Sequence, residues 1–339
     1  MPRLVVIEGD GIGPEVSRAA LRVLREALTL WGIDLEVVFV EAGDSAMAKY
    51  GDPLPPASWR MLEKADVIVK GPVGESAGDV VVRIRRGLDL YANIRPARCI
   101  VKSLCLKDID LVIVRENTED VYVRAEYLLP GDVAVALKVT SRRASERIAR
   151  VALELARGRR KHVTIVHKAN VLPVTDGLFR DTARTVARFY PDVSIDEAYV
   201  DAAVMDIVRR PERFDVILTT NLYGDILSDL AAYVSGSIGI APSANLGDSK
   251  AMFEPVHGAA FDIAGRNVAN PTAMILCFAW SLRWLGEKYR NATFANAGSS
   301  IEHAVESVLA ERRVLTQDLG GSATTSEFAE AVASKLAQA

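Results

Sequence analysis

Six short apolar segments, each ending in polar or glycine-rich residues, constrain the fold of this 339-residue chain more than any other feature. Helical patterns follow most of them, as 14–31 (PEVSRAALRVLREALTLW) follows the first. Buried strands that alternate with amphipathic helices predict an α/β protein with a largely parallel sheet covered by helices. The expected strands are 3–8 (RLVVIE), 35–43 (LEVVFVEAG), 65–74 (ADVIVKGPVG), 110–117 (DLVIVREN), 162–170 (HVTIVHKAN) and 214–221 (FDVILTTN).

Polar side chains gather where these strands end. Arg115, Lys168 and the loop that leads to Asp225 each lie at the end of an expected strand. Ligands of open α/β sheets bind beyond the carboxyl ends of the strands. We therefore expect the functional site at this edge.

Composition excludes several classes of protein. The 41 basic and 44 acidic residues give a formal net charge of −3, without the clustered basic excess of a nucleic-acid-binding protein. There is no run of about 18 or more apolar residues to span a membrane, and the start, MPRLVVIEGDGIG, lacks a signal peptide. The three cysteines are too few for a disulfide framework and lack metal-ligand spacing, which predicts a reducing, cytoplasmic setting. They are Cys99, Cys105 and Cys277.

The stretch 121–139 departs from the α/β pattern. Its residues alternate with period two on both sides of a Pro-Gly-Asp turn, which predicts a β-hairpin. An isolated hairpin is marginally stable, so it needs a second surface. That surface is either another subunit or the hairpin's own domain.

The glycine-rich segment 8–15 (EGDGIGPE) follows a strand and precedes a helix, as in a Rossmann nucleotide site. The Rossmann fingerprint requires glycine or alanine where this chain has Pro14, and no acidic residue ends a strand about twenty residues further on. A tight turn close to a ligand is the favoured interpretation.

Asp225 and Asp229 lie four residues apart on one side of an expected helix within 219–230 (TTNLYGDILSDL). Paired carboxylates repel unless a cation lies between them, and hard oxygen ligands without Cys or His favour Mg²⁺ or Mn²⁺. Asp201 is a third candidate acid. The alternative for Asp225 is a helix N-cap that follows Gly224.

Arginines among apolar residues suggest an anionic substrate, because Arg clusters suit bidentate carboxylate binding. These are Arg85, Arg95 and Arg115, and the alternative is that each pairs with an internal acid. Tyr122 is either a proton donor or an anchor for the hairpin. Lys168 is either a surface lysine or a catalytic base, since nearby positive charge favours the neutral amine.

Nine ordered motifs cover essentially the whole chain. They are GDGIGPEV, DLYANIRPAR, RENTED, HKANV, YVDA, GDILSD, EPVHGAAFDIAG, NPTA and DLGG. Together they resemble the metal-dependent β-decarboxylating dehydrogenases, which oxidise 3-isopropylmalate, isocitrate or homoisocitrate.

This resemblance implies an isopropylmalate/isocitrate dehydrogenase-like fold of two α/β domains, distinct from the Rossmann fold, with the active site between them. The first domain is expected to comprise 1–95 and 237–339, and the second 96–236. A homodimer, or a higher assembly, with shared active sites is also implied. The hairpin arm, at about 121–139, would clasp the two subunits.

The resemblance further implies a role for each candidate residue. Tyr122 is the expected acid and Lys168 of the other subunit the expected base, while Asp225 and Asp229 hold Mg²⁺ or Mn²⁺ together with Asp201 of the other subunit. The implied substrate-binding residues are Val81, Val82, Arg85, Arg95, Arg115 and Asp201.

The implied cofactor is NAD. Asp262 and Ile263 match the pair beside the adenosine ribose, where a carboxylate accepts from the 2′-hydroxyl and repels a 2′-phosphate. Family members that use NADP tend to carry Lys and Tyr there. The implied cofactor-binding residues are Asn170, Glu254, His257, Gly258, Ala259, Ala260, Asp262, Ile263 and Asn270.

Residues that precede Arg85 indicate the substrate. Isocitrate members place Ser and Asn where this chain has Asp79 and Val81, and homoisocitrate members can place Arg where it has Val82. Two valines favour 3-isopropylmalate, whose oxidative decarboxylation yields 2-oxoisocaproate in leucine biosynthesis, over isocitrate or homoisocitrate. Arg83 would reverse this preference if it turned toward a carboxylate, although a solvated arginine is the favoured interpretation. A non-catalytic regulatory subunit is a further alternative, but it should lack metal acids or the lysine, which are all present.

Overall fold

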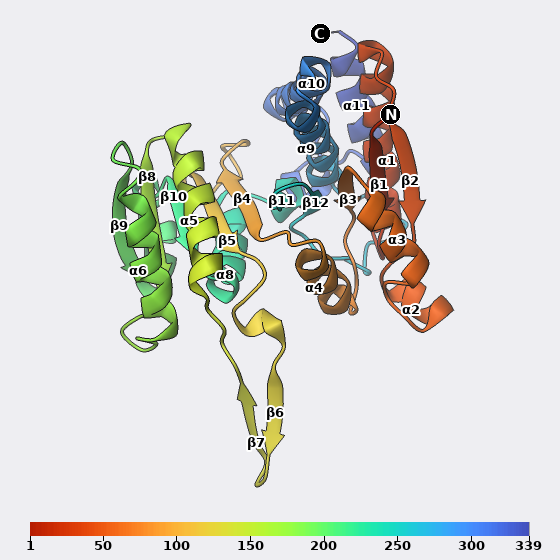
Figure 1. Cartoon of the computed structure of the whole chain (residues 1–339). Helices are drawn as coiled ribbons and strands as arrows, with labels where there is room; N and C mark the ends of the chain where they lie inside the picture. Colours follow the sequence, from red (N-terminus) through yellow and green to blue (C-terminus); the bar gives the residue numbers. More distant parts are fainter. Residues whose placement is uncertain (339) are drawn as a thin grey trace. The chain divides into compact units, whose positions relative to one another are not determined.

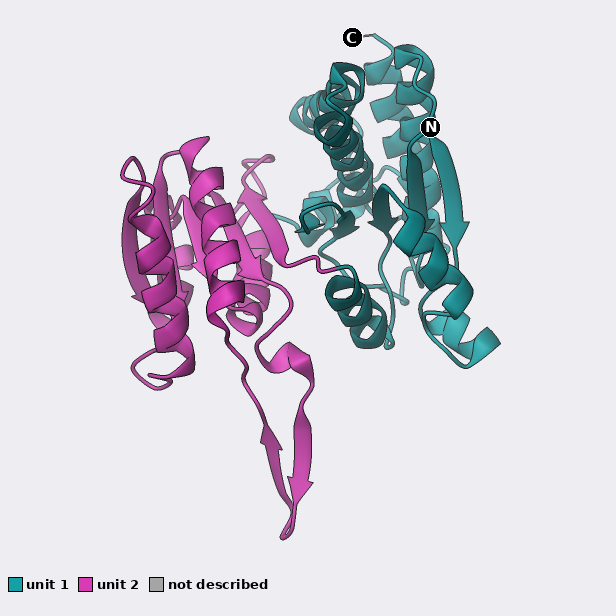
Figure 2. Cartoon of the chain, in the orientation of Figure 1, with its two compact units in different colours: residues 1–88, 236–339 teal, residues 89–235 magenta. Residues whose placement is uncertain are grey.

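The computed structural model describes residues 1–338, and this part of the chain forms two compact units (Figure 2). Unit 1 comprises Met1–Leu88 and the chain from Gly236 onward, and unit 2 comprises Asp89–Ser235. Residues 89–95, which we assigned to the first domain, lie in unit 2 instead. The reason is that β4 pairs along its whole length with β5 of that unit.

Unit 1 contains five strands in the order β2-β1-β3-β12-β11, parallel except for β11, which runs antiparallel to β12. β1 and β3 are buried almost throughout, as expected of parallel strands covered on both faces. Helices α1, α9, α10 and α11 pack against one another, and α9 also packs on β3 and β12 (Figure 1). The elements of unit 1 are β1 (Arg3–Ile7), α1 (Gly13–Trp31), β2 (Glu36–Val40), α2 (Asp44–Tyr50), α3 (Pro56–Lys64), β3 (Val67–Lys70), α4 (Ala77–Gly87), η3 (Ile238–Ile240), β11 (Pro242–Leu246), β12 (Ala251–Pro255), α9 (Thr272–Tyr289), α10 (Ala292–Glu311), η4 (Gln317–Leu319) and α11 (Thr325–Leu336).

Unit 2 has its own strand order, β4-β5-β10-β8-β9, in which β4 runs antiparallel to β5 and the other pairs are parallel. Leu111 and Ile113 face a core that α7 and α8 complete, so Val112 between them faces the opposite side of the sheet, where α5 packs. The elements of unit 2 are β4 (Ala92–Arg98), β5 (Asp110–Glu116), η1 (Val121–Val123), β6 (Glu126–Leu129), β7 (Val133–Ala136), α5 (Arg142–Arg157), β8 (His162–His167), α6 (Thr175–Ala187), β9 (Ser194–Tyr199), α7 (Val200–Arg209), η2 (Pro211–Arg213), β10 (Val216–Thr219) and α8 (Asn221–Val234).

The predicted hairpin forms within 121–139. β6 and β7 pair in antiparallel register from Glu126↔Ala136 to Leu129↔Val133, and the arm projects away from the sheet of unit 2 (Figure 1). Apolar side chains on the arm are exposed, among them Leu128 at 74%. Such an arm buries little of its own surface, and a two-stranded hairpin of this kind is only marginally stable by itself.

Cys99 and Cys105 form a disulfide, which corrects the prediction that the cysteines stay reduced. The chain leaves β4 and turns back on itself, so the two Cα atoms lie 5.8 Å apart, within the range that a disulfide spans. Cys277 is a buried free thiol. Among residues 1–338, no helix combines the length and apolarity needed to cross a bilayer.

Candidate active site

The carboxyl ends of β5, β10 and β8 bring three chain segments to one edge of unit 2. Thr219 of β10 lies beside Arg115 of β5 and beside Val166 of β8. Parallel strands in register end together, so Arg115, the start of α8 and Lys168 reach the same edge. The structure thus places the polar side chains where the strand pattern predicted them.

Asp225 is the centre of a charged cluster on α8. Its carboxylate accepts hydrogen bonds from the Arg115 guanidinium and from the Tyr122 hydroxyl. The N-cap of α8 is Thr220, so the alternative in which Asp225 caps this helix is wrong. The Asp225 carboxylate therefore contacts a cluster of side chains and does not cap the helix end.

Arg95 of β4 reaches both acids of α8. Its Nη1 donates to Ser228 Oγ at 2.7 Å and lies 3.2 Å from Asp225 and 3.4 Å from Asp229. Arg95 Nε is buried and has no hydrogen-bond partner within residues 1–338. Arg95 therefore pairs with internal acids and still retains a donor for a further anion.

The two carboxylates of α8 disfavour each other's charge. Partial removal from water raises the pKa of Asp229 above its usual range, and the Asp225 carboxylate adds to this rise, while Arg95 and Arg115 oppose it. Two guanidinium groups and a phenol hydroxyl currently offset this repulsion. A divalent cation would offset it more directly.

Gly224 allows α8 to approach Arg115 closely. A Cβ atom at this position would lie 2.5 Å from Cγ and 2.7 Å from Cβ of Arg115, closer than real side chains come. Glycine is thus required by packing against Arg115. The side chain of Arg115 is 1% exposed, so it has little room to move away.

Tyr122 is held against the same arginine. Its ring lies 5.1 Å from Arg115 Cζ, within range of a cation–π contact. It belongs to η1, which begins after Asp120, a residue with a left-handed φ of 69°. Non-glycine residues rarely adopt this conformation, and such strain is concentrated at functional sites.

Lys168 and Asp201 form a second group in unit 2. The Lys168 ammonium contacts the Asp201 carboxylate, whose side chain is 63% exposed. Within residues 1–338, no three acidic, histidine or cysteine side chains come together as a metal site. A single chain thus brings Asp225 and Asp229 together, whereas Asp201 remains with Lys168.

Arg85 and Glu254 form a buried ion pair in unit 1. Arg85 Nη2 donates to Glu254 Oε1 at 2.9 Å, and Lys70 Nζ lies 3.0 Å from Glu254 Oε2. Burial alone would raise the pKa of Glu254, but the Lys70 and Arg85 cations outweigh it and lower this pKa well below its usual range. The structure therefore joins an expected substrate residue to an expected cofactor residue.

A cavity of about 440 Å³ in unit 1 contains five of the expected cofactor residues. His257 Nε2 is buried and has no hydrogen-bond partner within the described residues, and burial lowers the pKa of this imidazole, so the ring is neutral at pH 7. An orphaned ring nitrogen in a cavity of this size fits a heteroaromatic ligand such as adenine. The cavity is lined by Ile12, Ser237, Ile238, Gly239, His257, Gly258, Ala260, Ile263, Val268, Ala269, Asn270, Gln317 and Asp318.

The glycine-rich turn after β1 packs against the segment around Ala259, beside the cavity that contains His257. Ile12 N donates to Ala259 O at 2.8 Å, and a Cβ on Gly11 would lie 2.0 Å from that oxygen. Gly11 also has a left-handed φ of 57°. The turn therefore shapes the backbone beside the cavity, in line with the interpretation of a tight turn close to a ligand.

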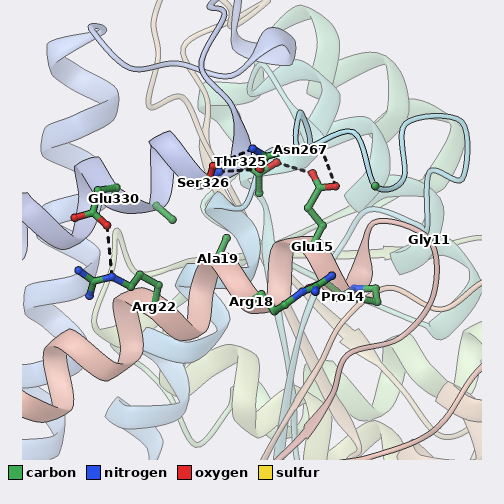
Figure 3. Close-up of a pocket in the computed structure, with 12 residues that line it drawn as sticks. Gly11, Pro14, Glu15, Arg18, Ala19, Arg22, Asn267, Thr325, Ser326 and Glu330 are labelled. Atoms are coloured by element: carbon green, nitrogen blue, oxygen red, sulfur yellow. Dashed lines mark hydrogen bonds and ion pairs between the residues drawn. The ribbon is translucent and has the colours of Figure 1, made fainter.

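Glu15 holds the segment around Asn267 and Ala269 in place. Its carboxylate accepts from the backbone N–H groups of Asn267 and Ala269 and from the Thr325 hydroxyl, at 3.1, 3.1 and 2.6 Å. Figure 3 shows Glu15 pointing toward Asn267 and Thr325 at one side of a second cavity, of about 620 Å³. Ala269 lines the cavity that contains His257, so Glu15 anchors one of its walls.

Other residues expected at the site do not line the cavity that contains His257. Asp262 is exposed next to Ile263, Ala259 is buried beneath the loop, and Asn170 is exposed in unit 2. Val81 and Val82 are half-buried on α4, the helix that carries Arg85. Arg83 on the same helix pairs with Asp52 at 3.1 Å, in agreement with its interpretation as a solvated arginine.

The sequence analysis did not identify two lysines with little exposed surface, the buried Lys70 and the half-buried Lys138. Lys70 ends the apolar strand β3 and is 3% exposed, and its place in a continuous buried run was the available signal. Lys138 follows the hairpin and contacts Asp120 and Asp176 at 3.0 and 3.3 Å. No local pattern distinguishes it from a surface lysine.

Known proteins resemble this chain over nearly its whole length. The family model described as isocitrate/isopropylmalate dehydrogenase matches residues 3–332. The 3-isopropylmalate dehydrogenase of Sulfurisphaera tokodaii is 50% identical over 335 residues, covering 98% of this chain and 98% of the relative. The isocitrate/homoisocitrate dehydrogenase of Thermus thermophilus is 49% identical over 343 residues, again covering 98% of each chain. The crystal structure of isocitrate dehydrogenase from Methylococcus capsulatus superposes with a TM-score of 0.92 at 41% identity, covering 99% of both chains. This chain belongs to the isocitrate/isopropylmalate dehydrogenase family.

Proposed function

We propose that this enzyme catalyses the NAD-dependent and divalent-metal-dependent oxidative decarboxylation of 3-isopropylmalate to 2-oxoisocaproate, CO₂ and NADH, a step of leucine biosynthesis. The observation that carries the proposal is the cluster of Arg95, Arg115, Tyr122, Asp225 and Asp229 at the strand ends of unit 2. It combines carboxylate-binding cations, a proton donor and paired hard ligands.

Asp225 and Asp229 fit a Mg²⁺ or Mn²⁺ ion, because both are carboxylates that repel each other on one helix face. The third acid would be Asp201 of a second copy of the chain. When bound, the metal would supply a Lewis acid that stabilises negative charge on the substrate's oxygens. Arg95 and Arg115 orient the substrate carboxylates in the same place.

Two residues of the chain move protons. Lys168, from a second copy, takes the proton of the 2-hydroxyl group as the hydride leaves C2. Tyr122 gives its proton to the enol carbon after CO₂ has left. The contact of the Tyr122 hydroxyl with Asp225 supports this role, since it places the phenol beside the proposed metal acid.

The cavity of unit 1 would hold the adenine half of NAD. His257 and Asn270 supply polar atoms to its wall, and Ile263 supplies an apolar surface. When bound, NAD accepts the hydride. The exposed Asp262 would accept a hydrogen bond from the ribose 2′-hydroxyl and would repel a 2′-phosphate.

Two features of α4 support 3-isopropylmalate as substrate. Val81 and Val82 are half-buried near Arg85, where a branched alkyl group would pack. Arg83 is occupied by Asp52 and lies over the Trp59 ring, so it is not free to meet a third carboxylate. Isocitrate or homoisocitrate is the alternative substrate, in keeping with the activity named for the Thermus relative.

Exposed apolar side chains in unit 2 support a homodimer. They lie on the hairpin arm and on α7 and α8, whose Met205 and Ile226 are 56% and 54% exposed. Exposed apolar side chains that gather on a few elements are typical of an interface. A second copy would also supply Lys168 and Asp201 to the cluster around Asp225.

The decisive experiment measures NAD reduction with 3-isopropylmalate, isocitrate and homoisocitrate in parallel, with and without EDTA. The proposal expects the highest kcat/KM with 3-isopropylmalate and loss of activity in EDTA. A higher kcat/KM with either tricarboxylic acid contradicts the substrate assignment. No reduction with any of the three acids contradicts the reaction itself.

A further inference from the structure

Lys138 lies at the base of the hairpin arm, yet its side chain is only 14% exposed. Its Nζ lies 3.0 Å from Asp120 Oδ1, 3.3 Å from Asp176 Oδ1 and 3.3 Å from Thr220 Oγ1. The two aspartate side chains are 2% and 0% exposed. Lysine is thus the cation of a buried ion triad rather than a solvated surface group.

Asp120 connects this triad to the cluster around Asp225. Its carboxylate accepts from the N–H groups of Val121 and Leu222 at 2.8 and 2.9 Å, which ties the segment of Tyr122 to the first turn of α8. The strained φ of Asp120 persists only because these contacts hold it. Its bridge to Val139 joins the same point to the returning strand of the arm.

Asp176 connects the triad to the other catalytic segment. Its Oδ2 accepts the backbone N–H of Lys168 at 2.7 Å, while its Oδ1 faces Lys138. Burial, followed by the Asp176 carboxylate, raises the pKa of the Tyr223 hydroxyl, so this neighbour stays neutral. The Tyr223 ring lies 4.5 Å from Lys138 Nζ.

Thr220 supplies a further observation. It occupies the N-cap position of α8 but makes no capping hydrogen bond with its side chain. Its hydroxyl instead accepts from Lys138. The residue that begins α8 is therefore oriented toward this lysine and not toward its own helix.

We propose that Lys138 is a positioning residue that sets the placement of the Asp225 segment relative to the Lys168 segment within unit 2, an inference that rests on the proposed function of those segments. Without its charge, Asp120 and Asp176 would be two buried carboxylates that repel each other. That repulsion would separate the start of α8 from the end of β8. Each proposed active site combines the Asp225 segment of one copy with the Lys168 segment of a second copy, so a displacement of either segment lowers the rate.

The test compares Lys138→Met, which removes the charge and keeps the length, with Lys138→Arg, which keeps the charge. Lys102→Met, at a side chain 85% exposed, is the control. Lys138→Met should lower kcat on the order of 10²-fold, as expected for a displacement of about 1 Å, and leave the KM for NAD nearly unchanged. It should also weaken Mn²⁺ binding measured by EPR without substrate. Lys138→Arg should recover most of both losses, and Lys102→Met should match the wild type.

A folded Lys138→Met enzyme with wild-type kcat and Mn²⁺ affinity overturns the inference, even if its melting temperature falls, because a purely structural role has that signature. If Lys138→Met does not fold, Thr220→Val tests the inference instead. It keeps the shape of the side chain and removes the hydroxyl, so the inference expects a lower kcat at an unchanged melting temperature, and an unchanged kcat overturns it. If the wild type oxidises none of the three acids, the proposed function fails, and Mn²⁺ binding by the same variants still tests the role of Lys138.

Discussion

Arg85 of α4 donates to Glu254 of β12 across 2.9 Å, and the opposite oxygen of Glu254 lies 3.0 Å from Lys70. All three side chains are at most 7% exposed. Glu254 thus orients the arginine expected to bind substrate. Arg85 Nε is buried and has no hydrogen-bond partner within residues 1–338, which leaves a donor for a ligand.

Replacement of this glutamate should destabilise unit 1. Glu254→Gln would leave Lys70 and Arg85 as two buried cations without a counter-charge, at a cost of about 3–5 kcal/mol. Denaturant unfolding measures the change. Glu311→Gln, which alters a surface pair with Lys335, is the control and should change stability by about 1 kcal/mol or less. Equal effects of the two substitutions would contradict the role assigned to Glu254.

The same glutamate predicts a pH dependence. Its pKa in the folded protein is lowered, because Lys70 and Arg85 outweigh the effect of burial. The ionised carboxylate therefore contributes stability above the unfolded pKa of about 4.3, and this contribution is lost as the pH falls below that value. The difference in unfolding free energy between wild type and Glu254→Gln should shrink between about pH 5 and the acid limit. A constant difference over that range would speak against the ion triad.

Gly224→Ala should lower kcat, although it adds only one methyl group. A methyl group there would lie 2.5 Å from Arg115 Cγ, so Gly224→Ala must displace either the arginine or α8. A displacement of about 1 Å lowers kcat on the order of 10²-fold. Gly177→Ala on α6, where the added Cβ meets nothing within 4 Å, is the matched control and should keep wild-type kcat. Wild-type kcat for both variants would show that Arg115 needs no such close packing.

The strands that the sequence predicts differ in composition from those that it does not predict. β1, β2, β3, β5, β8 and β10 are apolar runs, and each forms where the sequence predicts it. β4 (ANIRPAR) and β9 (SIDEAY) are not predicted, because arginine, proline and acidic residues interrupt their apolar pattern. The family and the α/β fold predicted from the ordered motifs are confirmed.

Only part of the candidate site can be predicted from the sequence. Asp225 and Asp229 are four residues apart on one helix, so their shared face follows from helix geometry alone. The pairs Lys70–Glu254 and Lys138–Asp176 join distant segments, and no local periodicity encodes them. The Cys99–Cys105 disulfide likewise depends on a turn whose conformation the intervening residues do not reveal.

Metal dependence can be tested with one carboxylate. Asp225→Asn keeps the shape of the side chain and removes the charge that a divalent cation requires, so it should lose most of its kcat while it remains folded by circular dichroism. EDTA should abolish wild-type activity, and Mg²⁺ or Mn²⁺ should restore it. Asp181→Asn, which alters an exposed pair with Arg180, should keep its activity. Full activity of a metal-free wild-type preparation would exclude the metal.

Cofactor preference should follow from Asp262. A carboxylate beside the ribose accepts from a 2′-hydroxyl and repels a 2′-phosphate, so kcat/KM should favour NAD over NADP by at least about tenfold, or about 1.4 kcal/mol. Asp262→Asn removes the repulsion and should narrow this ratio. Equal kcat/KM values of the wild type for NAD and NADP would contradict the placement of Asp262.

Substrate identity should respond to Val82. An isopropyl group packed against Val81 and Val82 contributes about 1–3 kcal/mol, a preference that permits some turnover of related malates. A third carboxylate placed there would meet apolar side chains without a matched donor, because Arg83 is paired with Asp52. Val82→Arg introduces the missing cation and should lower kcat/KM for 3-isopropylmalate while it raises kcat/KM for homoisocitrate. Val82→Leu, which keeps the apolar character, should not raise turnover of homoisocitrate.

The opposite outcome is that the wild type already prefers isocitrate or homoisocitrate. A cation of the unmodified chain then contacts the third carboxylate, and Arg83→Met tests whether that cation is Arg83. In that case the assignment of 3-isopropylmalate is wrong, while the roles of Asp225, Tyr122 and Lys168 in the oxidation and decarboxylation are unaffected.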